Sequence, residues 1–198
     1  MNKYYCLIIL VLIFNNNYAL SKDILEETLI YRGNLAFDQE TDEPISGKVV
    51  EYFEEEKIKS EGEYIDGVKV GIWKTYYENS EIESSITYSE GEKDGPFKLF
   101  HQNGELKAIG NYRNGKEDGN WQELKEDGKF MYIANYSNGQ LNGRWQSFHE
   151  NGRLNAMGDF TNGLKEGLWE YFNESGRLFK TQTFKSDEII KCEGFCDN

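Results

Sequence analysis

Apolar and aromatic residues return along this chain at a fixed interval of 24 positions. A glycine marks the start of each interval, and the apolar positions follow it at constant offsets. These glycines are Gly47, Gly71, Gly95, Gly119, Gly143 and Gly167. Because six copies stay in phase over residues 47–190, the sequence predicts a tandem repeat protein.

Four positions of each copy are apolar or aromatic in every copy. Two residues after the glycine stand Val49, Trp73, Phe97, Trp121, Trp145 and Trp169. Five residues after it stand Tyr52, Tyr76, Phe100, Leu124, Phe148 and Phe172. Eleven residues after it stand Ile58, Ile82, Leu106, Phe130, Leu154 and Leu178. Seventeen residues after it stand Tyr64, Tyr88, Tyr112, Tyr136, Phe160 and Phe184. We interpret the rings as one structural ladder along the repeats.

Two turn signals divide each copy. The first is a pair such as Asn103-Gly104 or Asn151-Gly152, and the second is a pair such as Asn114-Gly115 or Asn162-Gly163. These pairs supply the positive φ that tight hairpin turns need, because glycine has no Cβ to clash. Two turns divide each copy into two strands, so every copy predicts a β-hairpin. We count the repeat glycines Gly71, Gly95, Gly119, Gly143 and Gly167 as turn glycines too.

The second strand of each copy alternates in polarity. Residues 154–160 place Leu, Ala, Gly and Phe on one side and mostly polar residues on the other, which is typical of a half-buried antiparallel strand. The small residues leave room, and we expect the ring two residues after a repeat glycine to fill it. The ring five residues after the glycine would then lie on the opposite face of a regular strand. Either a bulge re-aims one of the two rings, or both faces of the sheet carry rings.

Stacked hairpins bury a shared row of rings, whereas one hairpin alone is marginal in water. The sequence therefore predicts an all-β fold, a single elongated antiparallel sheet to which each hairpin adds roughly 10 Å. The predicted repeats are 47–70, 71–94, 95–118, 119–142, 143–166 and 167–190.

Both ends depart from the repeat pattern. Residues 22–46 predict an N-terminal cap with a short hairpin about Gly33-Asn34, followed by an acidic loop. Residues 191–198 predict a C-terminal tail that contains Cys192 and Cys196. In an oxidising compartment these two cysteines are most simply a disulfide loop that pins the end strand. The alternative, half of a metal site, lacks a nearby histidine.

Residues 1–21 have the order of a secretory signal. Lys3 precedes an unbroken apolar run over residues 7–14, and small residues follow at Ala19 and Ser21. A run of this length rises only roughly 12 Å as a helix, against about 30 Å of membrane hydrocarbon. We expect cleavage after Ala19 or Ser21 and export to the periplasm or beyond; an uncleaved N-terminal anchor is the alternative. No later segment is predicted to cross a membrane.

The mature chain is acidic. The full chain has a net charge of −13, and loss of Lys3 with the signal leaves 21 basic against 35 acidic side chains, or −14. Such a surface repels phosphate backbones and anionic headgroups, so neither nucleic acid nor a membrane surface is an expected partner.

No catalytic or metal-binding constellation is present in the sequence, which predicts a protein that is not an enzyme and has no cofactor or metal. His101 and His149 both follow a repeat glycine by six residues, in a position near a turn that varies between copies, and we expect both side chains to be solvated. They are two hairpins apart, or roughly 20 Å, which excludes a shared metal ion. No phosphate-binding loop, nucleophile elbow or Asp-x-Asp-x-Asp-Gly calcium loop occurs.

The repeat motifs carry a family resemblance. Residues 143–148 read Gly-x-Trp-x-x-Phe, residues 112–119 read Tyr-x-Asn-Gly-Lys-x-x-Gly, and residues 44–47 lead into the first copy. With these motifs the chain resembles the MORN-repeat-variant proteins over about three quarters of its length. The resemblance implies hairpin repeats and an interaction surface. Bacterial proteins of this type, grouped as the YwqK family, are labelled antitoxin components of toxin–antitoxin systems.

These observations favour an exported, non-enzymatic scaffold that binds a partner protein through its extended surface. Two alternatives come from other functional classes. The first is glycan or cell-wall binding through exposed rings, and the second is neutralisation of a partner toxin.

Overall fold

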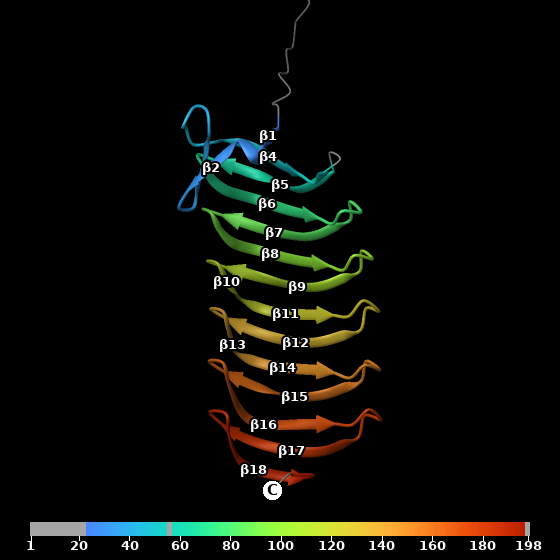
Figure 1. Cartoon of the computed structure of the whole chain (residues 1–198). Helices are drawn as coiled ribbons and strands as arrows, with labels where there is room; N and C mark the ends of the chain where they lie inside the picture. Colours follow the sequence, from blue (N-terminus) through green and yellow to red (C-terminus); the bar gives the residue numbers. More distant parts are fainter. Residues whose placement is uncertain (1–22, 55–56, 197–198) are drawn as a thin grey trace, which may run out of the picture.

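The computed structural model describes residues 23–54 and 57–196. It is a ladder of strands that follow one another down a single long sheet (Figure 1). The prediction of an all-β, elongated sheet of tandem hairpins is confirmed. The expected signal, residues 1–21, lies outside the described residues.

Chain order and spatial order agree along the sheet, because from β5 (Ile58–Ile65) onward each strand of its main path pairs antiparallel with the preceding strand of that path. Two short strands, β10 (Lys116–Glu117) and β13 (Gln140–Leu141), pair beside this path with β9 and β12. The other strands, in spatial order, are β1 (Ile24–Leu25), β4 (Gly47–Tyr52), β5 (Ile58–Ile65), β6 (Val68–Tyr76), β7 (Ile82–Ser89), β8 (Glu92–Phe100), β9 (Leu106–Arg113), β11 (Gly119–Leu124), β12 (Phe130–Ser137), β14 (Gly143–Phe148), β15 (Leu154–Thr161), β16 (Leu164–Phe172), β17 (Leu178–Lys185) and β18 (Glu188–Gly194).

The N-terminal end of the sheet is covered. A 3₁₀ turn, η1 (Glu26–Thr28), follows β1, which pairs parallel with β4. A separate hairpin, β2 (Leu29–Arg32) and β3 (Leu35–Asp38), then crosses this end. Two backbone hydrogen bonds attach this hairpin and the segment that follows it to the turn after β5: the Ala36 amide of the hairpin donates to the Gly67 carbonyl at 2.8 Å, and the Gly67 amide donates to the carbonyl of Ile45, just before β4, at 2.7 Å. The resulting hydrophobic cluster comprises Leu29, Ala36, Ile45, Val49, Tyr64 and Trp73.

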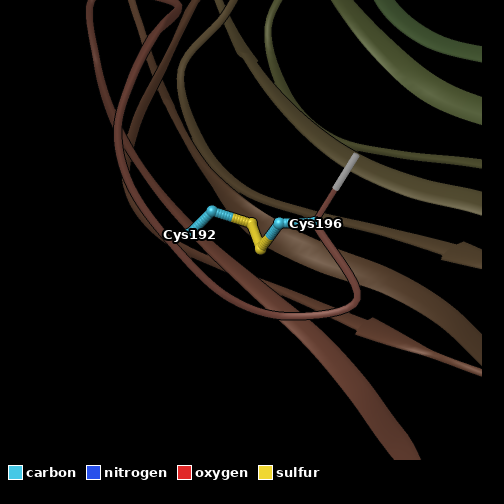
Figure 2. Close-up of a disulfide and its surroundings, with 2 residues drawn as sticks. All are labelled: Cys192 and Cys196. Carbon is cyan, nitrogen blue, oxygen red and sulfur yellow. A yellow bond between two sulfur atoms is a disulfide. The ribbon is translucent and has the colours of Figure 1, made fainter. Parts of the chain in front are cut away.

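The C-terminal end differs from the sequence prediction. We expected a tail from residue 191, but β18 continues to Gly194, because β17 offers a free edge as far as Lys180. Cys192 therefore belongs to the last strand and not to a tail. Its sulfur and that of Cys196 lie at disulfide distance, with Cα atoms 6.2 Å apart (Figure 2). The pair closes the end of this edge strand onto the loop that follows it.

The repeat glycines do not lie in turns, which corrects the sequence prediction. Gly71, Gly95 and Gly167 lie within β6, β8 and β16, and Gly119 and Gly143 begin β11 and β14. At Gly71 three residues of β6 face the single residue Gly62 of β5, so the glycine belongs to a bulge between consecutive hairpins. Its φ of +66° explains the residue type.

The two faces of the sheet carry different side chains. A Cβ built on Gly62 would meet the ring of Trp73, so Trp73 covers the face toward which residue 62 points. We call this the tryptophan face; it carries the rings two residues after the repeat glycines. Glu61 points to the opposite face, and the Tyr76 hydroxyl donates to its Oε1 at 2.6 Å. Rings therefore lie on both faces, which decides between the two sequence alternatives. We call the Glu61 side the mixed face.

Candidate functional site

Three tryptophans lie flat on three glycines of the preceding strand. Trp73, Trp121 and Trp169 come from every second repeat, and they cover Gly62, Gly110 and Gly158. A Cβ on any of these glycines would come within 2.1–2.3 Å of the indole. The glycine closes one hairpin and the tryptophan opens the next, so each contact joins two successive repeats.

Each of these indoles also makes the same hydrogen bond. Its Nε1 donates to the carbonyl of the residue after the covered glycine, at 3.3 Å for Glu63, 3.2 Å for Asn111 and 3.3 Å for Asp159. The three tryptophans are buried, with exposed fractions of 8, 8 and 1%. The aromatic ladder is thus a hydrogen-bonded internal layer on one side of a single sheet.

The rings of the ladder pack in pairs that recur in every second repeat. Phe97 stacks on Trp121 with centroids 5.2 Å apart, and Trp145 packs on Trp169 at 5.4 Å. The tyrosine or phenylalanine seventeen residues after each glycine fills the gaps edge to face, as Tyr112 and Tyr136 do against Trp121 at 5.2 and 6.0 Å. The effective structural unit on this face is therefore two hairpins and not one.

A second row of side chains crosses the same face beside the rings. Each repeat contributes one residue to this row. That residue is the Cα partner of the tyrosine or phenylalanine that stands seventeen residues after the repeat glycine. We call this row the cation row, because three of its members are lysines. It comprises Lys69, Lys93, Glu117, Leu141, Lys165 and Ile189.

The lysines of the cation row lie over the rings. Nζ of Lys69 is 4.1 Å from the Trp73 ring centre, and Nζ of Lys165 is 4.3 Å from that of Trp169. Nζ of Lys93 lies 4.9 Å from the Tyr112 ring centre. Burial lowers the pKa of both Lys69 and Lys165, because the rings displace the water that would solvate the ammonium. These contacts are cation–π interactions.

The mixed face shows a different kind of row. One residue on each strand of the main path, from β4 to β18, is the Cα partner of one residue on the next strand. The side chains of these residues therefore share this face along the sheet. The row runs Val50, Glu61, Lys74, Ser85, Lys98, Ile109, Gln122, Ile133, Gln146, Met157, Glu170, Thr181 and Glu193. The backbone repeats while the chemistry of the side chain changes from strand to strand.

The N-terminal part of the mixed face holds a polar network. Glu61 accepts from Tyr76 and pairs with Lys48, whose Nζ is 2.9 Å from Oε2. These two partners lower the pKa of Glu61. Burial, followed by the bond to Glu61, raises the pKa of Tyr76 to about 12. A shallow hollow beside this network is lined by Lys48, Glu61, Gly62, Glu63, Ile72 and Lys74.

The two histidines each contact a backbone carbonyl of the next hairpin. Nε2 of His101 is 3.0 Å from the Leu124 carbonyl oxygen, and Nε2 of His149 is 2.7 Å from that of Phe172. Tyr77 occupies the same position one repeat earlier, and its hydroxyl donates to the Phe100 carbonyl at 2.7 Å. These half-buried side chains join the first turn of one hairpin to the next hairpin, whereas we had expected a solvated position.

The structure does not gather the predicted residues into one compact site. The rings at residues 73, 97, 121, 145 and 169 form the layer on the tryptophan face, whereas Tyr76 lies on the mixed face and Phe148 contacts Phe130 at 5.6 Å. The backbone carbonyls of Phe100 and Phe172 are the partners of Tyr77 and His149 in the contacts between hairpins described above. Among residues 23–54 and 57–196, no group of three or more His, Cys, Asp or Glu side chains is placed to hold a metal ion. No helix within these ranges is long and apolar enough to cross a membrane.

The repeats match a known family at five places. The MORN repeat variant family matches residues 46–66, 69–90, 93–114, 141–162 and 165–186, which together make up more than half of the chain. The chain belongs to the MORN repeat variant family. The matches leave out the hairpin of β11 and β12, where Leu124 replaces the usual ring. That hairpin still continues the sheet without a break.

Comparison with individual proteins and solved structures shows only low similarity. No curated protein matches this chain. Among solved structures, a mutant of S. aureus TarM in complex with fondaparinux, α-GlcNAc-glycerol and UDP is 16% identical, with a TM-score of 0.32 over 48% of this chain and 19% of that chain. A second crystal structure of TarM is 16% identical, with a TM-score of 0.30 over 47% of this chain and 20% of that chain. The chain spans about a fifth of the length of these structures.

Two features of this MORN repeat variant protein were missed from the sequence. The first is the two-repeat alternation, whose signal was the small residue fifteen positions after every second repeat glycine, at Gly62, Gly110 and Gly158. The second is the cation row, whose signal was lysine at positions 69, 93 and 165, which hold the same place in their copies.

Proposed function

We propose that this protein is a non-enzymatic scaffold that binds a partner protein along the mixed face of its sheet. The observation that carries the proposal is the part of the row on this face from Glu61 to Glu193, in which a regular backbone presents a changing series of charged, polar and apolar side chains. Val50, at the N-terminal end of the row, is buried. Repeats of this kind suggest a protein that binds partners. A long surface whose side chain differs from each strand to the next supports recognition of one partner over others.

The mixed face also exposes apolar area that the fold itself does not need. Ile72 and Leu168 stand one residue after a repeat glycine and are 60 and 54% exposed. In the central hairpins the row presents Ile109, Ile133 and Met157. Apolar groups surrounded by polar ones are the usual composition of a protein-binding surface.

Affinity capture with matched variants tests this proposal. The bait is the full chain, and the test variant replaces Ile109, Ile133 and Met157 by serine. The matched control replaces the turn residues Asn103, Asn151 and Asn162 by serine, at the ends of the hairpins. We expect the wild-type bait and the control variant to recover a partner protein that the mixed-face variant does not recover. Equal recovery by both variants would contradict it, and the fluorescence of the tryptophans on the other face reports whether both are folded.

We further propose that the protein is exported. The support is the charge and apolar order of residues 1–21, together with a cysteine pair at disulfide distance, which an oxidising compartment favours. N-terminal sequencing of the protein recovered from the producing cells tests this. A chain that begins at Leu20 or Lys22 in the envelope or medium is expected, and a chain that retains its first residues inside the cell would contradict export.

Glycan binding and toxin neutralisation remain predictions from the sequence. The burial of Trp73, Trp121 and Trp169 supports a structural role for these rings rather than sugar stacking. A toxin-like gene adjacent to this one would favour neutralisation over the scaffold role.

A further inference from the structure

Three equivalent ring clusters lie along the tryptophan face, one in every second repeat. Each consists of a tryptophan on a glycine and the two rings that meet it edge to face. The clusters are Tyr64, Trp73 and Tyr88; Tyr112, Trp121 and Tyr136; and Phe160, Trp169 and Phe184. Their centroid distances to the tryptophan fall between 5.1 and 6.3 Å in all three. The chain has thus built the same arrangement three times.

The first and third clusters each hold an ammonium group supplied by the chain itself. Nζ of Lys69 lies 4.1 Å from the Trp73 ring centre and 5.5 Å from that of Tyr88. Nζ of Lys165 lies 4.3 Å from the Trp169 ring centre and 5.0 Å from that of Phe184. Lys69 lies over three rings and Lys165 over two, and an ammonium group in such a place gains from the negative faces of the rings, which offsets part of its lost hydration. This ring geometry therefore accepts an ammonium group.

The middle cluster has a carboxylate in place of the lysine. Glu117 is the Cα partner of Tyr112, as Lys69 is of Tyr64 and Lys165 is of Phe160. Its charge contributes to the raised pKa of both Tyr112 and Tyr136, after the larger effect of burial. Within the described part of the chain, no lysine or arginine forms an ion pair with Glu117. The middle cluster thus has a carboxylate at the position where the flanking clusters have an ammonium group.

The residues around the middle cluster add to the difference in charge between it and the two flanking clusters. A second carboxylate lies close to the cluster: Glu123 is the Cα partner of Tyr132, and it contributes to the raised pKa of Tyr132 and of Tyr136, after the larger effect of burial. Lys93, on β8, is the member of the cation row before Glu117, and its Nζ lies over Tyr112. The member of the cation row after Glu117 is the uncharged Leu141. Among residues 23–54 and 57–196, no lysine or arginine lies over the ring of Trp121 or Tyr136.

We propose that the middle cluster, formed by Trp121, Tyr112, Tyr136 and Glu117, is a binding site for an organic ammonium group from outside the chain. The ammonium takes the place that Nζ of Lys69 has in the first cluster, and it pairs with the Glu117 carboxylate. It enters from the Glu117 side, because Tyr112 and Tyr136 are half-buried whereas Trp121 is only 8% exposed. The site lies on the opposite face from the proposed protein-binding row, so either one stands without the other.

The indole N–H signals of the full chain provide a direct test. The chain contains four tryptophans, and ¹⁵N-labelled protein is titrated with n-butylammonium chloride, with n-butanol as the uncharged match and sodium chloride as the salt control. The proposal expects a saturable shift of the Trp121 signal in the millimolar range, with Trp73 and Trp169 unmoved. Butanol should bind roughly tenfold more weakly or not at all. A parallel titration with choline chloride separates the sources: tighter binding of butylammonium indicates a lysine side chain, and tighter binding of choline indicates a quaternary headgroup.

Exchange variants distinguish a binding site from a structural effect. Glu117→Lys gives the middle cluster its own ammonium and should abolish the Trp121 response, whereas Glu117→Gln should only weaken it. Lys69→Glu makes the first cluster equivalent to the middle one and should create a new response at Trp73. The proposal is overturned if butanol and butylammonium act alike, if all indole signals move together, or if Lys69→Glu brings no response at Trp73. The wild-type and Lys69→Glu titrations decide the matter even where Glu117→Lys does not fold.

Discussion

Replacing Gly110 by alanine places a methyl group where the Trp121 ring now lies. The new Cβ would be 2.3 Å from two ring carbons and 2.7 Å from a third. The backbone of Gly110 has an ordinary φ, as do Gly62 and Gly158, so alanine brings no backbone strain of its own. Any cost therefore comes from the contact between the two repeats.

The size of the effect follows from how far the indole must move. Ordinary carbon–carbon contact begins at about 3.5 Å, so the ring must rise by more than about 1 Å from β9. Overpacking of this kind costs about 1–3 kcal/mol. The movement also strains the bond from the Trp121 indole to the Asn111 carbonyl, a bond of about 1 kcal/mol. We expect Gly110→Ala to lower the free energy of unfolding by about 2–4 kcal/mol.

Urea denaturation followed by tryptophan fluorescence measures this cost, and a double-mutant cycle assigns it. In a Trp121→Leu background the methyl group meets a smaller side chain, so Gly110→Ala should cost less than about 1 kcal/mol. Gly163→Ala is the matched control, because a Cβ there meets nothing within 4 Å and only its φ of +83° is unfavourable. If Gly110→Ala costs the same with and without Trp121, the proposed contact between repeats is wrong.

Three further predictions use the same structure. Deletion of residues 119–142 brings Trp145 onto Gly110 and should leave a cooperative melt. Deletion of residues 95–118 instead puts Trp121 in the place of Phe97, against Ile86, and should lower the melting temperature sharply; equal melting temperatures would refute the two-repeat alternation. Because the folded-state pKa of Glu61 lies below its ordinary 4.5, its contribution is present above that pH and is lost as the pH falls through the folded pKa. Glu61→Gln should therefore flatten the acid side of a stability–pH curve, and an unchanged curve would contradict the role given to the Tyr76–Glu61–Lys48 network. Replacement of Cys192 and Cys196 by serine should speed amide exchange in β18 while β14 to β16 stay protected; uniform loss of protection would show that the pair supports more than the end strand.

The repeat pattern predicts most of the fold because its determinants are local. Asn-Gly and Asp-Gly turns and alternating apolar positions specify a hairpin within each copy, and short connections pair that hairpin with its neighbours. The strand through Gly194 was not predicted because its side chains, among them Glu188, Lys191 and Glu193, carry no apolar alternation. It forms because β17 presents a free edge, which is a property of the neighbour and not of the segment.

The functional surfaces were harder to predict because they depend on contacts between copies. The ring five residues after each glycine could face either way until the bulges were known, and Tyr76 is fixed on the mixed face by its bond to Glu61. The repeat glycines were assigned to turns because positive φ is the usual reason for glycine, whereas Gly71 uses it in a bulge. The exchange of lysine for Glu117 gains meaning only once Lys69 and Lys165 are seen over equivalent rings.

Nuclear Overhauser effects from the Trp121 indole test the central claim most directly, because this ring has two candidate partners. Trp121 is the Cα partner of Ala134 within its own hairpin, but the structure lays it on Gly110 of the preceding one. The account predicts strong effects from the indole ring protons to the Gly110 α protons. Effects to Ala134 alone, with none to Gly110, would show that the hairpins are not joined through tryptophan and glycine.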